Sequence, residues 1–457
     1  MQALILAGPI VPTMLRLGWP TIVVLVMQTL VGVAEIYFVG FLGTAALAGV
    51  TLAFPALMLM TMVSNGGIGG GVSSAIGRAI GAGRKDDADA LVLHTFVLAI
   101  GFGSLFTVGE LVGGRALYQL LGGSGDVLSA ALAYANIVFG GSVLAWITAL
   151  LAAALRGSGN VVVPAAISAG GFFILVPLSP SLIFGLGPLP HLGVAGAGMA
   201  VVIYFAAASL VLIAYLRSRR SPVRLSFALG NLRLQLFRDI LGVGAVSAIG
   251  GVQTNLTVGI VTGIVGVFGA DAIAGYGLAS RLDYLQIPLL FGLGTAVVTM
   301  VATNTGAGNM ARAYAIAWRG ALVAFIFTET LGLLVAIFPQ AWLGLFTHDQ
   351  RVLAAGTAYL HAVAPFYGMV GAGLLLYFAG QGLGKVIWPV LAGTLRLLIA
   401  SGVSFLLVVH WHQSMSLLFS VVAIGYCTFG AATAISTYLT ERQHSSPLGV
   451  RARTDAA

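Results

Sequence analysis

Three short segments of this chain occur twice, about 225 residues apart. The members of each pair share their glycine positions, and the spacing differs by no more than one residue from pair to pair. Repetition at one fixed spacing indicates that the chain contains two copies of one structural unit. The matched pairs are 81–83 with 306–308, 156–160 with 381–385, and 42–49 with 268–275.

The composition places both copies in a lipid bilayer. Hydrophobic residues make up 59% of the chain and charged residues 7%, whereas a soluble domain carries about 25% charged residues. The mean hydropathy is +1.04. The single cysteine, Cys427, lies in an apolar run, which excludes a disulfide framework and a cysteine-based metal site. We expect neither a metal nor a cofactor.

Apolar segments of about 20 residues predict transmembrane helices. We count six in each copy and therefore predict an all-α membrane protein with twelve transmembrane helices. Because six is even, both copies enter the membrane in the same sense, and an axis along the membrane normal should relate them, as in many secondary transporters. The predicted spans are 15–38, 46–76, 90–112, 128–154, 161–184, 193–216, 240–267, 272–301, 313–338, 353–379, 386–409 and 414–438.

The positive charges predict the orientation. Most of the 21 lysines and arginines fall on one side of the predicted spans, and only Arg115 and Arg351 fall on the other. The positive-inside rule makes the first side cytoplasmic and places both termini there, with the chain in the inner (plasma) membrane. Membrane topology also explains the net charge of +8, so no nucleic-acid partner is expected.

The spans and charges together predict the domain organisation. We expect an N-terminal lobe at 1–216, a cytoplasmic linker at 217–239, a C-terminal lobe at 240–440 and a disordered cytoplasmic tail at 441–457. The basic linker should lie along the anionic inner leaflet. We expect the protein to be a monomer.

Charged residues inside the spans are the first candidates for chemistry, because a charge in hydrocarbon needs a partner or a water-filled cavity. Glu35, Asp283 and Glu329 are the candidates for cation or proton coupling, and Arg281 and Arg396 are candidate charge partners. A second interpretation pairs these arginines with Asp283 or Glu329 in a structural salt bridge. For Arg281 we expect such a pair. Glu35 differs, because no other deeply placed acid or base is predicted in its copy.

Several polar residues within the spans could line a substrate cavity, although packing between helices would explain them equally well. They are Gln28, Tyr37, Asn65, Tyr204, Gln253, Asn255, Tyr276 and Tyr367. The glycine-rich stretch 66–71 lies inside an apolar span with no preceding strand, which favours close helix packing over phosphate binding. Because the stretch ending at Lys385 also departs from a P-loop, transport would have to use an ion gradient.

The residues in these segments resemble the multidrug and toxic compound extrusion (MATE) transporters. Stretch 39–48, preceded by Pro20 and Glu35, resembles the first-helix signature of that family. The resemblance implies two six-helix lobes around a V-shaped cleft. It also implies export of bulky, often cationic, organic compounds in exchange for protons or sodium. Further similar stretches are 77–84, 305–312, 182–185 and 193–197.

The resemblance is strongest to the DinF-like branch, whose first-helix acid is usually aspartate and is matched here by Glu35. That branch also uses an Asn and an Asp on helix 5, where this chain has Leu175 and Ser179. The acids of the NorM-like branch are missing as well: span 7 offers Gln253 and Asn255, and span 10 only His361. A sodium ion needs several oxygen ligands, whereas one carboxylate suffices for a proton, so we expect proton coupling.

Two functions from different classes remain. The first is a MATE-type antiporter, and the alternative is a lipid-linked saccharide flippase of the same broad superfamily. Flippases of that kind usually show several cavity arginines and extra helices, and here only Arg281 and Arg396 are embedded. An enzyme is not expected, because no metal-binding or nucleophile motif lies in the spans.

Overall fold

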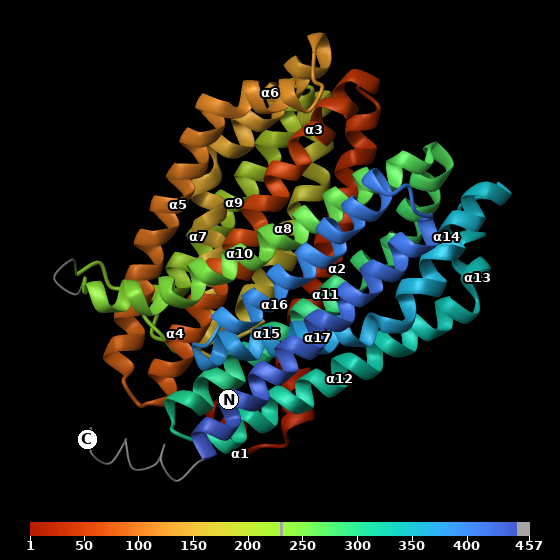
Figure 1. The fold of residues 1–457 in the computed structure, drawn as a ribbon. Coiled ribbons are helices and arrows are strands. Elements are labelled where there is room, and N and C mark those ends of the chain that lie inside the picture. The colour runs from red at the N-terminus through yellow and green to blue at the C-terminus, as the bar shows by residue number, and fades with distance from the viewer. Residues whose placement is uncertain (229–231, 446–457) are drawn as a thin grey trace. The chain divides into compact units, whose positions relative to one another are not determined.

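The computed structural model describes residues 1–228 and 232–445. Every regular element in these residues is a helix (Figure 1). The earlier elements are α1 Gln2–Ala7, α2 Ile10–Gly40, α3 Thr44–Thr61, η1 Met62–Ile68, α4 Gly69–Gly81, α5 Lys85–Leu120, α6 Gly125–Gly140, α7 Ser142–Gly157, α8 Val162–Phe184 and α9 Val194–Arg217. The later ones are α10 Leu234–Val265, η3 Gly266–Phe268, α11 Ala270–Gly306, α12 Met310–Ile337, α13 Pro339–Leu343, α14 Gln350–Val363, η4 Ala364–Phe366, α15 Tyr367–Leu383, α16 Ile387–Leu397, η5 Leu398–Val403, η6 Leu406–His410 and α17 Met415–Ser445.

Among the described residues, eleven helical segments are long and apolar enough to cross a membrane. Helices α6 and α7 form a twelfth span if counted together, bent by 49° where they meet. A glycine suits the bend, because a Cβ on Gly141 would lie 2.6 Å from the side chain of Val202 on α9. The twelve predicted spans and the all-α fold are therefore confirmed.

Contacts divide the chain into two compact units at different boundaries from those predicted. The first unit comprises Met1 and residues 19–244, and the second comprises residues 2–18 and the chain from Ala245 onward. Residues 2–18 thus pack with the second copy, and residues 217–228 and 232–239, the described part of the segment predicted as a linker, pack with the first. Of the predicted tail, residues 441–445 continue α17, and the rest lies outside the described residues.

Inside each unit the helices pair in the same way. In the first unit α3 packs on α6, α4 and α5 on α7, and α8 on α9. In the second unit the corresponding pairs are α11 with α14 and α15, α12 with α15, and α16 with α17. This correspondence supports the duplication inferred from the sequence repeats.

The repeated glycines occupy equivalent turns. Gly83 and Gly308 end their helices with φ of 73° and 75°, a left-handed conformation that only glycine adopts at little cost. In each turn the N–H of the next residue bonds back to a helix carbonyl at 2.9 Å, which closes the helix end. The turns at Gly159 and Gly384 repeat the pattern, with φ of 83° and 73°. Two of the three sequence islands are therefore helix-ending turns, and the third, at Gly43 and Gly269, begins a helix in each unit.

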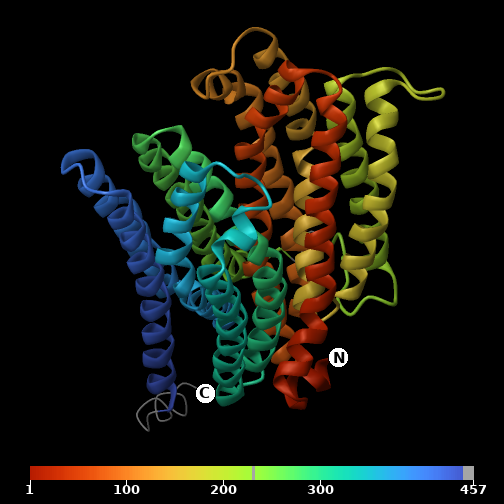
Figure 2. The ribbon, with the colours of Figure 1, turned by 90° about the vertical axis from the view of Figure 1, so that its right-hand side faces the viewer.

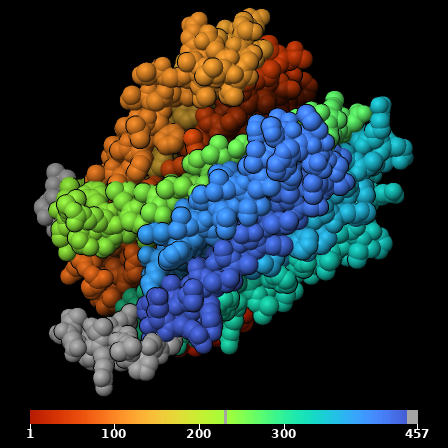
Figure 3. Space-filling view, viewed as in Figure 1, coloured from red at the N-terminus to blue at the C-terminus, as the bar shows by residue number. Residues whose placement is uncertain are grey.

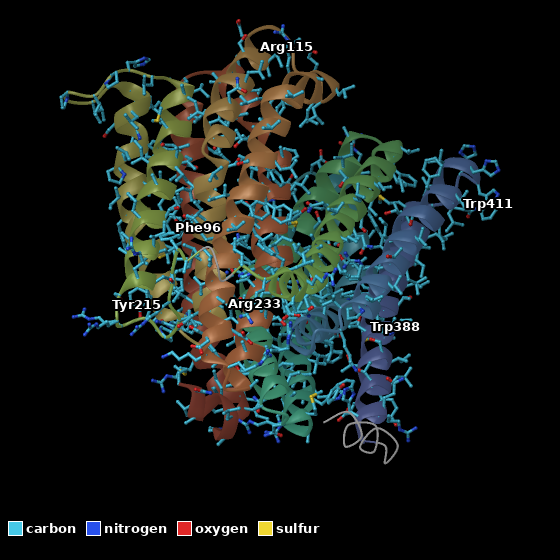
Figure 4. All side chains as sticks on the ribbon, turned by 90° about the vertical axis from the view of Figure 1, so that its left-hand side faces the viewer. Phe96, Arg115, Tyr215, Arg233, Trp388 and Trp411 are labelled. Atoms are coloured by element: carbon cyan, nitrogen blue, oxygen red, sulfur yellow. The ribbon has the colours of Figure 1, made fainter. Side chains whose placement is uncertain are left out.

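The segment after α9 packs on the start of α5. The Arg233 guanidinium forms an ion pair with Asp87 at 2.5 Å, and the Arg224 N–H donates to Asp89 at 2.7 Å. His94 accepts from the Arg233 N–H at 2.9 Å. Figure 4 shows Arg233 and Tyr215 near one end of the first unit and Arg115 near the other.

We expect Asp87→Asn to increase tryptic cleavage in the segment 217–228 while the protein stays folded. The substitution removes the negative charge that pairs with both Arg233 and Arg84. An exposed ion pair contributes at most about 1 kcal/mol, which corresponds to roughly fivefold faster cleavage by local opening. Timed gel analysis measures the rate. Asp271→Asn, which breaks the exposed pair with Arg351 in the second unit, should leave it unchanged; equal rates in both variants would contradict the packing role.

The N-terminal segment and the end of α17 both form hydrogen bonds at the same end of the second unit, near the start of α12. Arg312 donates to the carbonyl of Ile5 at 3.2 Å, and Asn304 donates to the same oxygen at 3.2 Å. Near the end of α17, Glu441 accepts from the Trp318 indole N–H at 2.9 Å. The N-terminal segment and the described end of α17 therefore lie on one side of the second unit (Figure 2).

Large apolar side chains cover much of the outer helix surfaces, as expected where helices face lipid. Figure 3 shows α16 and α17 side by side on one face of the second unit. Trp388 begins the segment formed by α16, η5 and η6, and Trp411 follows its end; the two are 60% and 59% exposed. Tryptophans at both ends of a span are typical of the two membrane interfaces (Figure 4).

Candidate functional site

Glu35 lies on α2, five residues before the helix ends at Gly40, or about 7.5 Å along the helix axis. Its carboxylate is half-buried, and among the described residues the buried Oε1 atom has no hydrogen-bond partner. Tyr134 on α6 lies close enough to interact electrostatically with it. A carboxylate with a free acceptor in an apolar helix is available to a ligand or a proton.

The surroundings of Glu35 in the first unit are apolar. Val31 of α2 packs with Phe172 and Leu175 of α8 in one buried cluster. Ser179, also on α8, is fully buried, and its hydroxyl lacks a partner among the described residues. Leu175 and Ser179 are the positions where the resemblance implies further cation ligands, so α8 offers one hydroxyl where that branch has an amide and an acid.

The first unit contains another buried acid, Glu110 on α5, so the prediction of a single embedded ionisable group was wrong. Glu110 is 6% exposed and accepts from the Tyr118 hydroxyl at 2.6 Å. Glu110 lies two residues before the end of the predicted span 90–112, whereas α5 continues to Leu120. Its spacing of eight residues from Tyr118 puts both on one helix face, and that spacing could have revealed the pair.

In the second unit Asp283 of α11 is enclosed by tyrosines. Its Oδ2 accepts from the Tyr359 hydroxyl at 2.6 Å and from the Tyr426 hydroxyl at 3.2 Å. The Tyr367 hydroxyl lies beside the same carboxylate, and Arg396 interacts with it electrostatically. The other oxygen, Oδ1, is buried and has no partner among the described residues.

Arg396 of α16 contacts two side chains besides its interaction with Asp283. It donates to the Thr254 hydroxyl at 3.2 Å, and its guanidinium lies 5.2 Å from the centre of the Phe429 ring. Such cation–π contact partly replaces the hydration that the cation lacks inside a membrane. The segment that follows Arg396 leaves α-helical geometry at once and continues as the π-helix η5.

The expected pairing of Arg281 with Asp283 or Glu329 is not observed. The Arg281 guanidinium lies 5.9 Å from the centre of the Phe346 ring, and among the described residues it forms no ion pair within 4.0 Å. Glu329 accepts from the Gly368 N–H at 2.8 Å, at the start of α15. An acid at a helix N-terminus is stabilised by unpaired backbone N–H groups, which accounts for this contact of Glu329.

The predicted cavity residues fall into two groups. The buried ones contact neighbours within their own unit: Gln253 donates to Thr394 at 2.7 Å, Tyr204 stacks on Phe172, and Tyr276 packs on Tyr359. The others are exposed and are compatible with either lipid or substrate contact. The buried group is Tyr204, Gln253, Tyr276 and Tyr367, and the exposed group is Gln28, Tyr37, Asn65 and Asn255.

Curated relatives are similar to this chain over most of its length. A probable multidrug resistance protein NorM from Thermotoga maritima is 25% identical over 83% of this chain and 81% of its own length. An FAD transporter from Shewanella oneidensis is 27% identical over 82% of each chain. The multidrug export protein MepA from Staphylococcus aureus is 24% identical, covering 85% of this chain and 86% of its own.

Solved structures share the fold. A MOP superfamily transporter from Pyrococcus furiosus superposes with a TM-score of 0.87 at 23% identity, covering 97% of this chain and 99% of the other. A MATE structure in a bent conformation also gives 0.87 at 23% identity, covering 100% and 99%. The family model described as MatE matches residues 20–181 and 248–406, well over half of the sequence. The chain therefore belongs to the MATE family of multi-pass membrane transporters and is not an enzyme.

Proposed function

We propose that this protein is a secondary antiporter that exports bulky, often cationic, organic compounds in exchange for protons, with Glu35 as the coupling acid. The family assignment supports export of drugs or toxic compounds, and two of the relatives named above carry multidrug resistance or export in their names. The FAD transporter among the relatives extends the range of large organic solutes. The relatives do not favour the saccharide flippase alternative.

The observation that carries the coupling proposal is the free Oε1 of Glu35. An ionised carboxylate held among apolar helices without a donor attracts either a cationic substrate or a proton. Binding one of them neutralises the charge and weakens the binding of the other. This mutual exclusion is the requirement for exchange, because a carrier that binds both ligands together would not export one at the expense of the other.

The position of Glu35 gives the exchange a direction. With the termini in the cytoplasm, as the charge distribution favours, the end of α2 at Gly40 faces outside, and Glu35 lies within two turns of it. A proton from the outside then displaces the substrate from Glu35 and is released after the protein has opened to the cytoplasm. The same orientation places the protein in the inner (plasma) membrane, and we propose that it works as a monomer.

A proton suits this site better than sodium. A hard cation takes about six oxygen ligands, whereas Glu35 has Tyr134 nearby and α8 contributes leucine and serine at its two key positions. A proton needs one oxygen atom only.

The proposal can be tested with purified protein reconstituted into liposomes that are loaded with a fluorescent organic cation. We expect an imposed proton gradient to drive efflux of the dye and an equal sodium gradient to leave it at the passive rate. Liposomes without protein give that passive rate. Efflux that follows the sodium gradient alone would contradict proton coupling.

A further inference from the structure

We propose that Asp283 is a second proton-binding site, enclosed in the second unit by tyrosines and by Arg396. The inference rests on the proposed function and extends it, because it adds a proton at a site with different surroundings from those of Glu35. Four helices contribute to it: Tyr359 comes from α14, Tyr367 from α15, Arg396 from α16 and Tyr426 from α17.

The two oxygens of Asp283 have different environments. Oδ2 accepts both hydroxyl hydrogen bonds, from Tyr359 and Tyr426, while Oδ1 is buried and without a partner among the described residues. A buried acceptor without a donor costs free energy. Proton uptake forms one O–H bond on Oδ1 and leaves both bonds at Oδ2 in place, and release breaks that same bond. The Tyr367 hydroxyl, beside the carboxyl group, can donate to the ionised form and accept from the protonated one.

The charge at this site favours a proton over a metal ion. Arg396 interacts electrostatically with Asp283, so the ionised pair is neutral overall. A sodium ion would have to sit beside the guanidinium, where like charges repel strongly in a medium of low dielectric constant. A proton instead bonds to the acid and removes its charge. The groups that face Asp283 or Arg396 are Tyr276 and Tyr284 of α11, Tyr359, Tyr367, Tyr426, Thr254 and Phe429.

The repeat gives independent support. Tyr359 and Tyr134 are 225 residues apart, the spacing of the repeat, and in each unit this tyrosine lies beside an embedded acid, Asp283 or Glu35. The acids themselves come from different helices, α11 and α2. The positions one repeat before Arg396 and Phe429 hold Gly171 and Tyr204, which are also in contact. The sites at Asp283 and Glu35 therefore both contain a tyrosine at the same repeat position, and only the Asp283 site has a cation, Arg396, at the second position.

Loss of the negative charge has a direct structural consequence. When Asp283 is protonated, Arg396 loses its counter-charge and keeps Thr254 and the Phe429 ring. Arg396 lies two residues before the π-helix η5. Two buried hydroxyls, of Ser401 within η5 and of Ser404 just after it, have no partner among the described residues. π-Helical segments are frequent at functional sites. Protonation of Asp283 thus removes the electrostatic attraction between Asp283 and Arg396, which lies close to the point where α16 passes into η5.

Infrared difference spectra between neutral and acid pH test the site on intact protein in lipid nanodiscs. We expect the carbonyl band of a protonated carboxylic acid in the wild type to lose one component in Asp283→Asn. The component should remain in Asp271→Asn, an exposed acid on the same helix, and in Glu35→Gln. In Arg396→Gln it should persist to higher pH, because the counter-charge is gone. Melting curves of each variant establish that it is folded, and Asp283→Glu should restore the component if the asparagine variant is unstable.

The outcomes separate this inference from the role of Glu35. Spectra of folded Asp283→Asn that superpose on those of the wild type would overturn the second site and leave the Glu35 proposal intact. Normal efflux in Glu35→Gln would overturn the Glu35 proposal, while the Asp283 component would still be judged from the spectra.

Discussion

Glu35→Gln is expected to abolish proton-driven efflux while the protein remains folded and monodisperse. Glutamine has the size of a protonated glutamate but cannot release a proton, so the exchange cycle stops. For the same reason substrate affinity should lose its pH dependence. In the wild type it should fall as the pH falls, by at most about tenfold per pH unit for one competing proton. Liposome efflux and binding titrations at several pH values measure both effects.

Glu110→Gln is the matched control, because Glu110 is an embedded acid of the same unit that already has a donor, Tyr118. It should transport at nearly the wild-type rate. Glu35→Asp should keep partial activity, since the shorter acid can still carry a proton. Wild-type efflux in a well-folded Glu35→Gln protein would transfer the coupling role to Asp283 or Glu329.

Gly275→Leu is expected to prevent stable folding of the second unit. Gly275 lies where α11 crosses α14, and a Cβ there would be 2.4 Å from the carbonyl oxygen of Val352 and 2.7 Å from the nitrogen of Gly356. These are backbone atoms that cannot move without separating the two helices. Overpacking typically costs 1–3 kcal/mol, and a rigid backbone clash should cost at least about 3 kcal/mol. The yield of monodisperse protein and its melting temperature in detergent report the loss.

Gly277→Leu provides the control on the same helix. A Cβ at Gly277 would meet nothing within 4 Å, so the variant carries the same change in size and hydrophobicity without the clash. The equivalent position in the first unit, Gly49, faces the carbonyl of Val127 at 2.9 Å and should be as sensitive as Gly275. Equal melting temperatures for Gly275→Leu and Gly277→Leu would contradict the close approach.

The fold could be predicted from the sequence because its determinants are local. A membrane span can be predicted from the length of its apolar run. The helix-ending turns are indicated by glycines such as Gly83 and Gly308, whose left-handed conformation few other residues adopt. The bend between α6 and α7 was not predicted, because the apolar run continues through it and the side chain that lies close to Gly141 comes from α9.

The site could be predicted only in part. Glu35 and Asp283 stood out because each is an acid in an apolar run, but the partners of Asp283 come from four other helices, and no spacing along the chain reveals them. The protein partner considered for Asp283 was an arginine, whereas tyrosine hydroxyls supply donors without a second charge. For the same reason Arg281 was expected beside an acid and is found over an aromatic ring.

The unit boundaries have a consequence for the ancestry of the chain. In each repeat the beginning of the first helix belongs to the unit formed by the other repeat. Helix α2 starts among residues of the second unit, and α10 starts among residues of the first. A gene fragment encoding one repeat alone would therefore lack a segment that only another copy can supply. Two separate copies would supply that segment to each other by exchanging these helix starts, as in a domain-swapped dimer.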